Sequence, residues 1–377
     1  MSKISKLGKI LNGKSIPSEK GIYPAFGGNG VIGHVNKFNF DENTVVIGRV
    51  GANCGAVHFS DDKCWVTDNA LAFIVENANP YYVYLLLQFL NLNKYHIGSS
   101  QPLLTQNIIS NIEYNFVDNK LTQDKVALVI KSIDRKISNN NKINAELESL
   151  AKTIYDYWFL QFEFPNEEGK PYKSSGGKMV WNEELKREIP EGWRKGSLSD
   201  ICSITMGASP NGESLNENQN GLIFYQGKAD FSFRFPSIRM FTTSPIRYAK
   251  KNDVLISVRA PVGDLNIANN DCCIGRGLAA LHSSYPSYLY YKMVSSKNLF
   301  SYYNQNGTTF GAVTKENLHN LEIVVPNEKT IMLFEKTISP LDKKISILSQ
   351  ENQELSSLRD FLLPMLMNGQ ISFSDDI

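Results

Sequence analysis

The chain has 377 residues, 42% of them apolar and 20% charged, which are globular values, and its length exceeds what one hydrophobic core usually supports. Two domains are therefore expected, and without an apolar run of roughly 18 residues or a secretion signal they belong to a soluble, cytoplasmic protein with no membrane contact. The net charge of +1 counts mildly against a free-standing nucleic-acid binder, so DNA binding would require a local basic patch or positively charged partners.

The first predicted element is a compact domain of short strands and turns, residues 1–120. Its segment from Gly8 to Ser15, GKILNGKS, matches the nucleotide-binding pattern G-x-x-x-x-G-K-[ST]. That loop needs a buried strand before it and a helix after it, but only seven residues precede Gly8, and Pro17 and Gly21 interrupt the segment where the helix would have to lie. A P-loop enzyme is therefore an unfavoured alternative. A strand is predicted at 44–50, TVVIGRV.

A second motif in this domain, Asn79-Pro-Tyr-Tyr, is similar to the Asn-Pro-Pro-Tyr element of adenine methyltransferases. The second proline is missing, and no glycine-rich cofactor loop follows a strand upstream. We prefer a structural interpretation, in which the proline leads into a helix from Tyr82 to Leu92. The sequence also lacks a convincing carboxylate-and-lysine cluster for a nuclease, so no catalytic residue is expected.

The next element is a long helix, residues 121–164. Its apolar residues alternate in steps of three and four, which places them on one seam that must be buried against a similar seam. At roughly 1.5 Å per residue this helix is about 60 Å long, which suits a spacer. The seam residues are Ile130, Ile133, Ile137, Leu147, Leu150 and Ile154.

Residues 165–192 form the predicted linker, because their prolines and glycines are too dense for a helix. A second domain comes next at 193–327 and repeats the first at an offset of about 200 residues. Its LSDICSITMGAS repeats ISKLGKILNGKS with the same apolar, glycine and serine spacing, and GTTFGAVTKENLHNLE from Gly307 repeats GSSQPLLTQNIISNIE from Gly98. The second copy also has a predicted strand at 253–259, DVLISVR.

A second long helix, residues 328–370, repeats the first at an offset of 208 and precedes a tail at 371–377. Asn144 and Asn352 fall at the same seam position, where we hypothesise that a buried amide favours one register. Pro340 should kink this helix or restart it, with Ser339 as N-cap. The seam residues are Ile338, Leu341, Ile345, Leu355, Leu358 and Leu362.

Together these elements predict an α+β fold with two similar domains of mixed strands and short helices. The two long helices would pair antiparallel as a coiled coil and hold the domains at opposite ends. Two similar but non-identical domains on a spacer suit duplex DNA, since about 34 Å per helical turn places the half-sites one to two turns apart. The architecture thus predicts a two-part DNA reader.

Candidate DNA-contacting residues are arginine, asparagine, glutamine, serine, threonine and lysine side chains near glycines, because such groups can address base edges. In the first domain they are Arg49, Asn53, Ser99, Ser100, Gln101 and Gln106. In the second domain they are Lys228, Arg234, Arg239, Arg259, Arg276, Thr308 and Thr309. For each of them, a solvated surface residue or a turn hydrogen bond is the alternative interpretation.

Metal and disulfide chemistry is not expected. Five cysteines without C-x-x-C spacing and five scattered histidines match neither a zinc site nor a disulfide framework. We predict buried thiols and no metal ligands.

Across essentially its whole length the chain resembles the specificity subunits of type I restriction-modification systems. The resemblance rests on GSSQPLLT from Gly98, on YDYWFLQFEFPNEEGKPYKSSGGKMVWNEELKREIPEGW from Tyr155, and on LLPMLMNGQI from Leu362. It implies a split, asymmetric DNA target, two modification subunits bound to the helices and domain bases, and added restriction and translocase subunits. Those partners would use S-adenosylmethionine, ATP and Mg²⁺ for adenine methylation, translocation and cleavage, and this chain would carry no cofactor.

A coiled-coil adaptor that joins proteins without touching DNA remains an alternative from a different functional class. The bulk charge permits it. A basic patch at matching positions on both domains would decide for DNA binding, and its absence would favour the adaptor.

Overall fold

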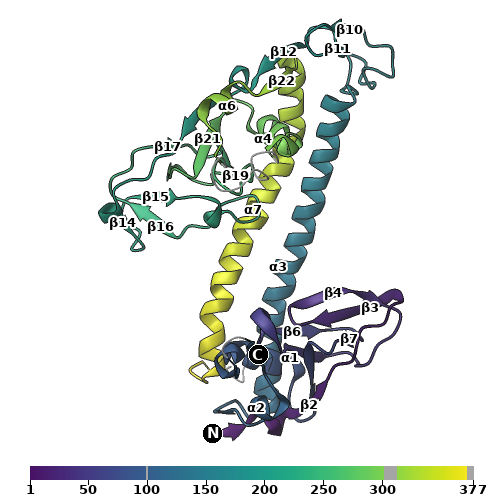
Figure 1. Cartoon of the computed structure of the whole chain (residues 1–377), viewed down its shortest axis with the longest axis vertical. Helices are drawn as coiled ribbons and strands as arrows, with labels where there is room; N and C mark the ends of the chain where they lie inside the picture. Colours follow the sequence, from purple (N-terminus) through teal and green to yellow (C-terminus); the bar gives the residue numbers. More distant parts are fainter. Residues whose placement is uncertain (99–100, 301–311, 372–377) are drawn as a thin grey trace. The chain divides into compact units, whose positions relative to one another are not determined.

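The computed structural model describes residues 1–98, 101–300 and 312–371, and they form two compact units (Figure 1). Unit 1 contains residues 1–139 together with 352–377, and unit 2 contains residues 140–351. Each unit therefore joins one copy of the repeat to a part of both long helices.

Unit 1 is built on two sheets. The larger one has four antiparallel strands, ordered β2 (Gly8–Asn12), β8 (Ala70–Val75), β5 (Thr44–Gly48) and β6 (Val57–Ser60). The smaller one is ordered β4 (Gly30–Val35), β3 (Lys20–Gly27) and β7 (Trp65–Val66), with β3 and β7 parallel. β5 is buried along its whole length, because its apolar run TVVIG lies between β8 and β6.

Short helices complete unit 1. α1 (Pro80–Phe89) packs against β5 and β6 and buries Tyr82, Leu85 and Leu86 in the core. α2 (Gln106–Ser110) comes next, and β9 (Glu113–Tyr114) pairs with β1 (Ser2–Lys3), which ties the end of the copy to its beginning.

Unit 2 repeats this topology. Its four-stranded antiparallel sheet is ordered β13 (Ser203–Met206), β21 (Leu278–His282), β18 (Val254–Ser257) and β19 (Leu265–Ile267). Its second sheet has five strands, ordered β14 (Leu215–Asn216), β16 (Met240–Thr242), β15 (Leu222–Tyr225), β20 (Cys272–Ile274) and β17 (Tyr248–Ala249). α4 (Pro286–Ser295) matches α1, and α6 (Lys315–His319) matches α2. The pairing of β12 (Arg194–Ser197) with β22 (Glu322–Val325) matches the pairing of β1 with β9. The predicted tandem repeat and both predicted strands are confirmed.

The repeated glycine has the same structural task in both copies. A Cβ on Gly13 would lie 1.9 Å from the carbonyl oxygen of Thr67, and a Cβ on Gly207 would lie 2.1 Å from that of Gly275. The backbone there passes too close to a neighbouring segment for any side chain. Because Gly8–Asn12 is a strand paired with β8, GKILNGKS does not form the loop and helix N-terminus of a P-loop.

The repeated threonine caps a helix in both copies. Thr105 Oγ1 accepts a hydrogen bond from Ile108 N at the start of α2, and Thr314 Oγ1 accepts one from Asn317 N at the start of α6. A side-chain acceptor at this position satisfies an amide that has no partner within the helix.

Replacing Thr105 or Thr314 with alanine is expected to lower the free energy of unfolding by about 1 kcal/mol each, since the cap is lost. Urea unfolding of each variant measures this, and the corresponding serine variants should retain most of the stability. Serine variants as unstable as the alanine variants would contradict the capping role.

Both long helices are present. α3 (Lys120–Tyr155) ends in a π-helical turn, Asp156–Leu160, and α7 (Glu328–Met367) continues through Pro340 without interruption. The predicted restart at Ser339 is therefore wrong. Pro340 is exposed while Ile338 and Ile345 beside it are fully buried, so packing on the opposite face holds the helix together despite the missing amide donor.

The two helices lie antiparallel within each unit. In unit 2, Asn140 Nδ2 donates to Glu351 Oε2 at 2.8 Å, and Asn144 Nδ2 donates to Ser349 Oγ at 3.3 Å. In unit 1, Arg359 Nη1 contacts Asp134 Oδ1 at 3.2 Å. Asn144 is fully buried, as a seam amide should be, although its Oδ1 has no partner in the described part of the chain.

Most of the predicted seam faces inward. Ile130, Ile133, Ile338 and Ile345 are buried, and Ile137, Leu147, Ile154, Leu341, Asn352, Leu355 and Leu362 are half-buried. Leu150 and Leu358 are 49% and 46% exposed, so their placement in the seam is wrong. Ala151, which is fully buried beside Leu150, takes the inward position.

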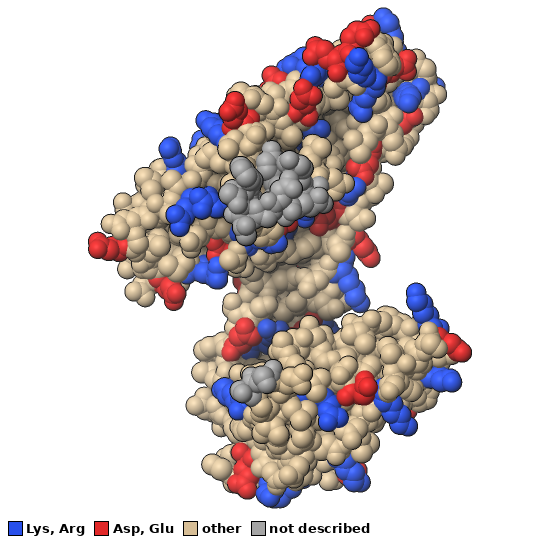
Figure 2. All heavy atoms as spheres, in the orientation of Figure 1, with Lys and Arg blue, Asp and Glu red and all other residues tan. Residues whose placement is uncertain are grey.

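The surface is mixed in charge. On the face drawn in Figure 2, basic and acidic side chains are intermingled over both units. Within residues 1–98, 101–300 and 312–371, no helix combines the length and apolar character that crossing a membrane needs. All five cysteines are buried and unpaired, as predicted.

Candidate nucleic-acid interface

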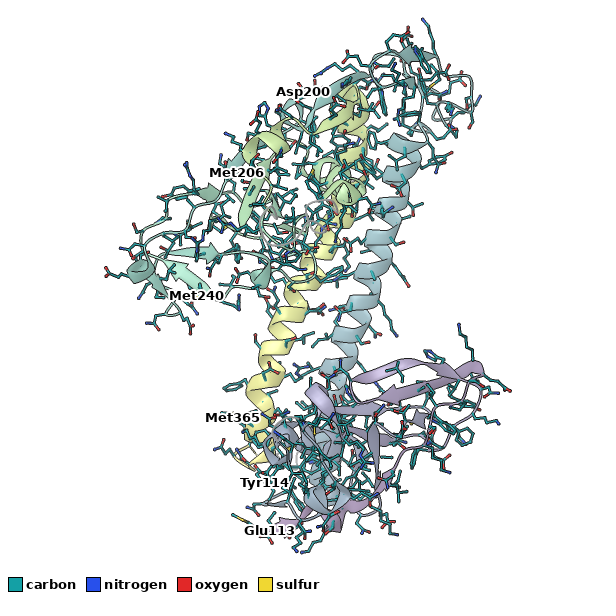
Figure 3. The ribbon with its side chains drawn as sticks, viewed as in Figure 1. Glu113, Tyr114, Asp200, Met206, Met240 and Met365 are labelled. Carbon is teal, nitrogen blue, oxygen red and sulfur yellow. The ribbon has the colours of Figure 1, made fainter. Side chains whose placement is uncertain are left out.

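In each unit, four segments meet at one end of the sheets and form what we call the loop face. In unit 1 they are residues 13–15, 27–28, 49–51 and 67–69. In unit 2 they are residues 207–209, which come after Met206 at the end of β13 (Figure 3), together with 226–227, 258–259 and 275–277.

The same backbone hydrogen bonds hold the loop face together in both units. Gly13 N donates to Ala70 O and Gly207 N to Leu278 O, at 3.3 and 2.9 Å. Three further bonds of unit 1 have a counterpart in unit 2. The bond from Lys14 N to Val66 O matches the bond from Ala208 N to Ile274 O, and the bond from Arg49 N to Asn69 O matches the bond from Val258 N to Gly277 O. The bond from Leu104 N to Arg49 O matches the bond from Val313 N to Val258 O. The repeat thus preserves the scaffold of the loop face.

The loop face of unit 2 carries two exposed arginines. Arg259 and Arg276 are exposed, and neither makes an ion pair within the described residues. They lie on neighbouring segments, because Val258 N donates to Gly277 O at 2.9 Å. Exposed guanidinium groups of this kind can bind phosphate oxygens or the O6 and N7 atoms of guanine.

The loop face of unit 1 carries cations at other positions. Lys14 is exposed and, in the part of the chain described, has no ion pair. Arg49 is half-buried, and its Nη1 lies 3.4 Å from Asn12 Oδ1. Its buried Nε has no hydrogen-bond partner among the residues that the structure describes. In the sequence, Lys14 stands out only as part of the P-loop pattern. Its position in the repeated loop is the signal that adds it to the candidate readers.

Matching positions of the two loop faces hold different side chains. The backbone pairing places Lys14 opposite Ala208, Arg276 opposite Asp68, and Arg259 opposite Val50. Both faces therefore contain cations, but each displays its own pattern of charge. Among the described residues the cations of the two loop faces do not occupy matching positions, so the basic patch expected at matching positions of a DNA reader is not found, and this criterion does not by itself exclude an adaptor.

Three further predicted readers lie beside the loop face of unit 1. Asn53 is exposed in the 3-10 turn Gly51–Asn53, and Gln101 is exposed just before Pro102, whose carbonyl accepts from Gly51 N at 3.1 Å. Gln106 is half-buried in the first turn of α2. The predicted readers Ser99, Ser100, Thr308 and Thr309 lie outside the described residues.

Lys228 and Arg239 already have acidic partners. Lys228 Nζ lies 2.5 Å from Asp264 Oδ2, and Arg239 Nε donates to Asp230 Oδ1 at 3.1 Å. Asp230 is buried and also accepts from Gln226 N at 2.7 Å, so this pair holds a segment of the loop face in place. Base contacts by either cation would have to compete with its carboxylate.

Arg234 lies in the interior of unit 2 and not on its surface. Its side chain is 1% exposed, so it cannot reach DNA, and the prediction that it reads bases is wrong. Its guanidinium lies 3.5 Å from the ring centre of Tyr290 and is bound by Asp342 of α7, by Glu148 of α3 at 3.4 Å and by Tyr291 Oη at 3.2 Å. Arg234 instead anchors a loop of unit 2 to both long helices.

The methyltransferase-like motif has a structural role, as we preferred. Asn79 Oδ1 accepts from Tyr82 N at 3.0 Å and caps α1, and Pro80 occupies the first turn, where its missing amide donor costs nothing. The helix begins at Pro80 and ends at Phe89, slightly earlier than predicted. Among the described residues, no group of three or more His, Cys, Asp or Glu side chains could hold a metal ion.

Comparison with known proteins gives a consistent result. Residues 1–149 and 190–357 match the type I restriction modification DNA specificity domain. The specificity subunit of the MjaIX type I restriction enzyme of Methanocaldococcus jannaschii is 26% identical over 321 residues, which cover 77% of this chain and 68% of that protein. The HindI specificity subunit of Haemophilus influenzae is 23% identical over 384 residues, which cover 81% of each.

A solved structure shares the fold. The S subunit of the type I restriction-modification system from M. genitalium aligns with a TM-score of 0.68 and 17% identity, and the alignment covers 99% of this chain and 96% of that one. The predicted combination of repeated α+β domains and long helices therefore has a known counterpart.

Proposed function

Because the chain belongs to the type I restriction modification DNA specificity family, we propose that each of its two units reads one half of a split, asymmetric DNA target. Sequence-specific DNA recognition is the function of this family. The observation that carries the two-part assignment is the pair of loop faces, which share a backbone scaffold and differ in their charged side chains. A shared scaffold would dock similarly on DNA, while different side chains would select different bases.

The catalytic steps belong, in this proposal, to partner subunits. Two modification subunits would bind S-adenosylmethionine and methylate adenine, and restriction and translocase subunits would use ATP and Mg²⁺. Apolar side chains exposed on the long helices, such as Leu128, Leu358 and Phe361 at 68%, 46% and 61%, support docking of partners there. This chain itself would supply only recognition of the DNA target sequence.

Mapping of methyladenine tests the proposal. The chain is co-expressed with its neighbouring modification subunit in a host without DNA methylation, and methylated positions are mapped across the genome. We expect one split motif with a fixed gap. If both proteins are made and associate, yet no methylation depends on this chain, the adaptor function is favoured instead.

Exchange of one domain is expected to change one half of that motif. Replacing residues 193–327 with the corresponding domain of a relative should alter the half read by unit 2 and leave the other half and the gap unchanged. The same methylome measurement reads this out. A change in both halves, or an unchanged motif, would contradict independent reading by the two units.

A further inference from the structure

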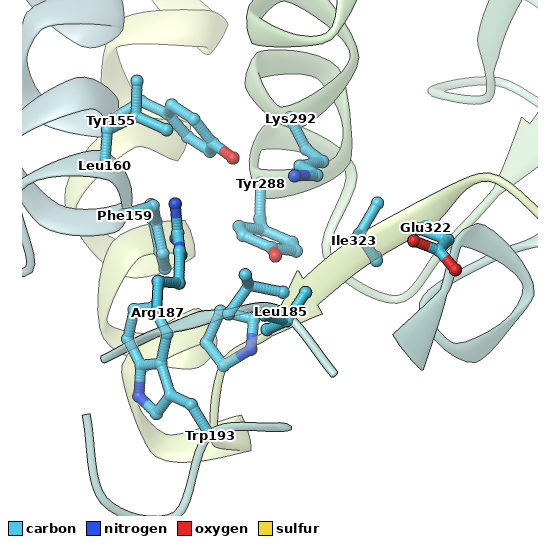
Figure 4. A pocket seen from close by; sticks show the side chains of 12 residues that line it. Tyr155, Phe159, Leu160, Leu185, Arg187, Trp193, Tyr288, Lys292, Glu322 and Ile323 are labelled. Carbon is cyan, nitrogen blue, oxygen red and sulfur yellow. The ribbon is translucent and has the colours of Figure 1, made fainter. Parts of the chain in front are cut away.

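Unit 2 contains a pocket away from its loop face, with a volume of about 320 Å³ (Figure 4). Its floor and walls combine residues of the π-helical turn, α4, β22 and the segment between the two copies. The aromatic side chains in it are Tyr155, Phe159, Trp193 and Tyr288, and the charged ones are Arg187, Lys292 and Glu322. A small concave site with aromatic walls and few polar groups is the usual form of a ligand site.

Two cations of this pocket have no counterion. Lys292 on α4 and Arg187 on β11 (Arg187–Pro190) reach it from different elements (Figure 4), and within the described residues neither makes an ion pair. Glu322 does not neutralise them, because its carboxylate pairs with Lys195 at 2.6 Å. The indole Nε1 of Trp193 is also buried, and no described residue accepts a hydrogen bond from it.

The repeat shows that the fold does not require a lysine here. α1 and α4 align from Pro80 and Pro286, which places Leu86 of the first copy at the position of Lys292. Leu86 is fully buried in the core of unit 1. The second copy thus carries a half-buried ammonium at a position where the first copy has an apolar side chain. Its burial costs desolvation energy that no partner in the described part of the chain offsets.

We propose that this pocket binds a small organic anion whose carboxylate or phosphate lies between Lys292 and Arg187 and whose flat ring packs against the aromatic walls. The anion supplies the missing negative charge, and the ring takes the place of water against Tyr155, Phe159 and Tyr288. The site is independent of DNA recognition by the loop face.

The electrostatics of the empty pocket agree with this assignment. Burial, together with the positive charge of Arg187, lowers the pKa of Lys292 to about 8. The tyrosines that face the pocket, Tyr155 and Tyr288, have pKa values raised by burial and stay neutral. An anion beside Lys292 would raise the pKa of its amine, so affinity should be full below pH 8 and fall as the pH rises above it.

Titration calorimetry on the full chain tests the proposal with two probes. Indole-3-acetate carries a ring with a carboxylate, and adenosine monophosphate carries a ring with a phosphate. Their uncharged counterparts, indole-3-acetamide and adenosine, serve as matched controls. We expect one of the anions to bind with 1:1 stoichiometry at pH 7, its counterpart to bind roughly tenfold or more weakly, and the affinity to fall between pH 8 and 10. Which anion binds identifies the charged group.

The repeat supplies the matched variant, Lys292→Leu, which installs the residue of the first copy. It should have at least the thermal stability of the parent, because the desolvation cost of Lys292 is removed. It should also bind the anion roughly tenfold or more weakly and lose the pH dependence above 8. Arg187→Gln, at an exposed position, gives a second test that does not disturb the core. Absence of binding by both anions up to millimolar concentration, equal binding of an uncharged counterpart, or unchanged affinity in both variants would overturn the proposal.

Discussion

Replacing Asp342 with alanine is expected to lower the free energy of unfolding of unit 2 by about 3–5 kcal/mol. Asp342 on α7 pairs with the guanidinium of Arg234, whose side chain is 1% exposed. Without the carboxylate, the described partners of Arg234 are Glu148 at 3.4 Å, the hydroxyl of Tyr291 and the ring of Tyr290, and a buried charge remains poorly compensated. Urea unfolding of the full chain, with hydrogen exchange of the β18 and β21 amides as the readout for unit 2, measures the loss.

The repeat provides the control, because Asp134 on α3 lies 208 positions before Asp342 and also pairs with an arginine, but with one that is partly exposed. It accepts from Tyr81 Oη at 2.6 Å and pairs with Arg359, whose side chain is 35% exposed. Since water can solvate Arg359, Asp134→Ala should cost only about 1–2 kcal/mol, mostly for the hydroxyl of Tyr81.

A double variant separates the loss of a contact from the burial of a charge. Arg234→Met combined with Asp342→Leu removes both charges and should recover much of the stability that Asp342→Ala loses. Equal costs for Asp342→Ala and Asp134→Ala, or no recovery in the double variant, would show that the ion pair is not what joins this loop to the helices.

The architecture could be predicted because the sequence contains two copies of the same domain and helix. Gly13 matches Gly207, and Thr105 matches Thr314. Each glycine allows a close backbone contact, and each threonine caps a helix, so the fold needs both features in both units. Features that occur once escaped this comparison. Pro340 has no counterpart in α3, and its tolerance depends on the burial of Ile338 and Ile345 around it, which helix propensity alone does not describe.

The candidate site was harder to predict, because exposure depends on partners distant in sequence. Arg234 lies in the polar-aromatic stretch FSFRF and is as suited to DNA as Arg259 by residue type alone. What removes it from the surface is Asp342, 108 residues later. Lys228 likewise pairs with Asp264, while Arg259 and Arg276 have no ion pair within residues 1–98, 101–300 and 312–371. The residue type alone marks each arginine as a candidate for DNA contact, but tertiary contacts decide which arginine is exposed and able to reach DNA.

Removing both exposed arginines of unit 2, Arg259→Ala with Arg276→Ala, is expected to weaken binding of the target DNA by at least roughly 30-fold. Each guanidinium lost from a base or phosphate contact costs about 1–3 kcal/mol, and the two sit on adjacent segments of one loop face. Electrophoretic mobility shifts with the assembled modification complex, at several salt concentrations, give the affinity and its salt dependence. If the arginines contact phosphates, their removal should flatten the salt dependence of binding. If they contact bases, their removal should relax the sequence preference in one half of the target.

The control for this prediction must remove the same charge elsewhere. Lys336 and Lys344 are exposed on α7, outside the loop face, so the variant Lys336→Ala with Lys344→Ala changes the net charge equally. It should keep the sequence preference of the parent in both halves of the target. If instead the two double variants weaken binding alike and neither alters the methylated motif, attraction by net charge accounts for the arginines. The pattern of charge on the loop face would then not be what selects the sequence, and the readers would have to be sought among uncharged side chains such as Asn53 and Gln101.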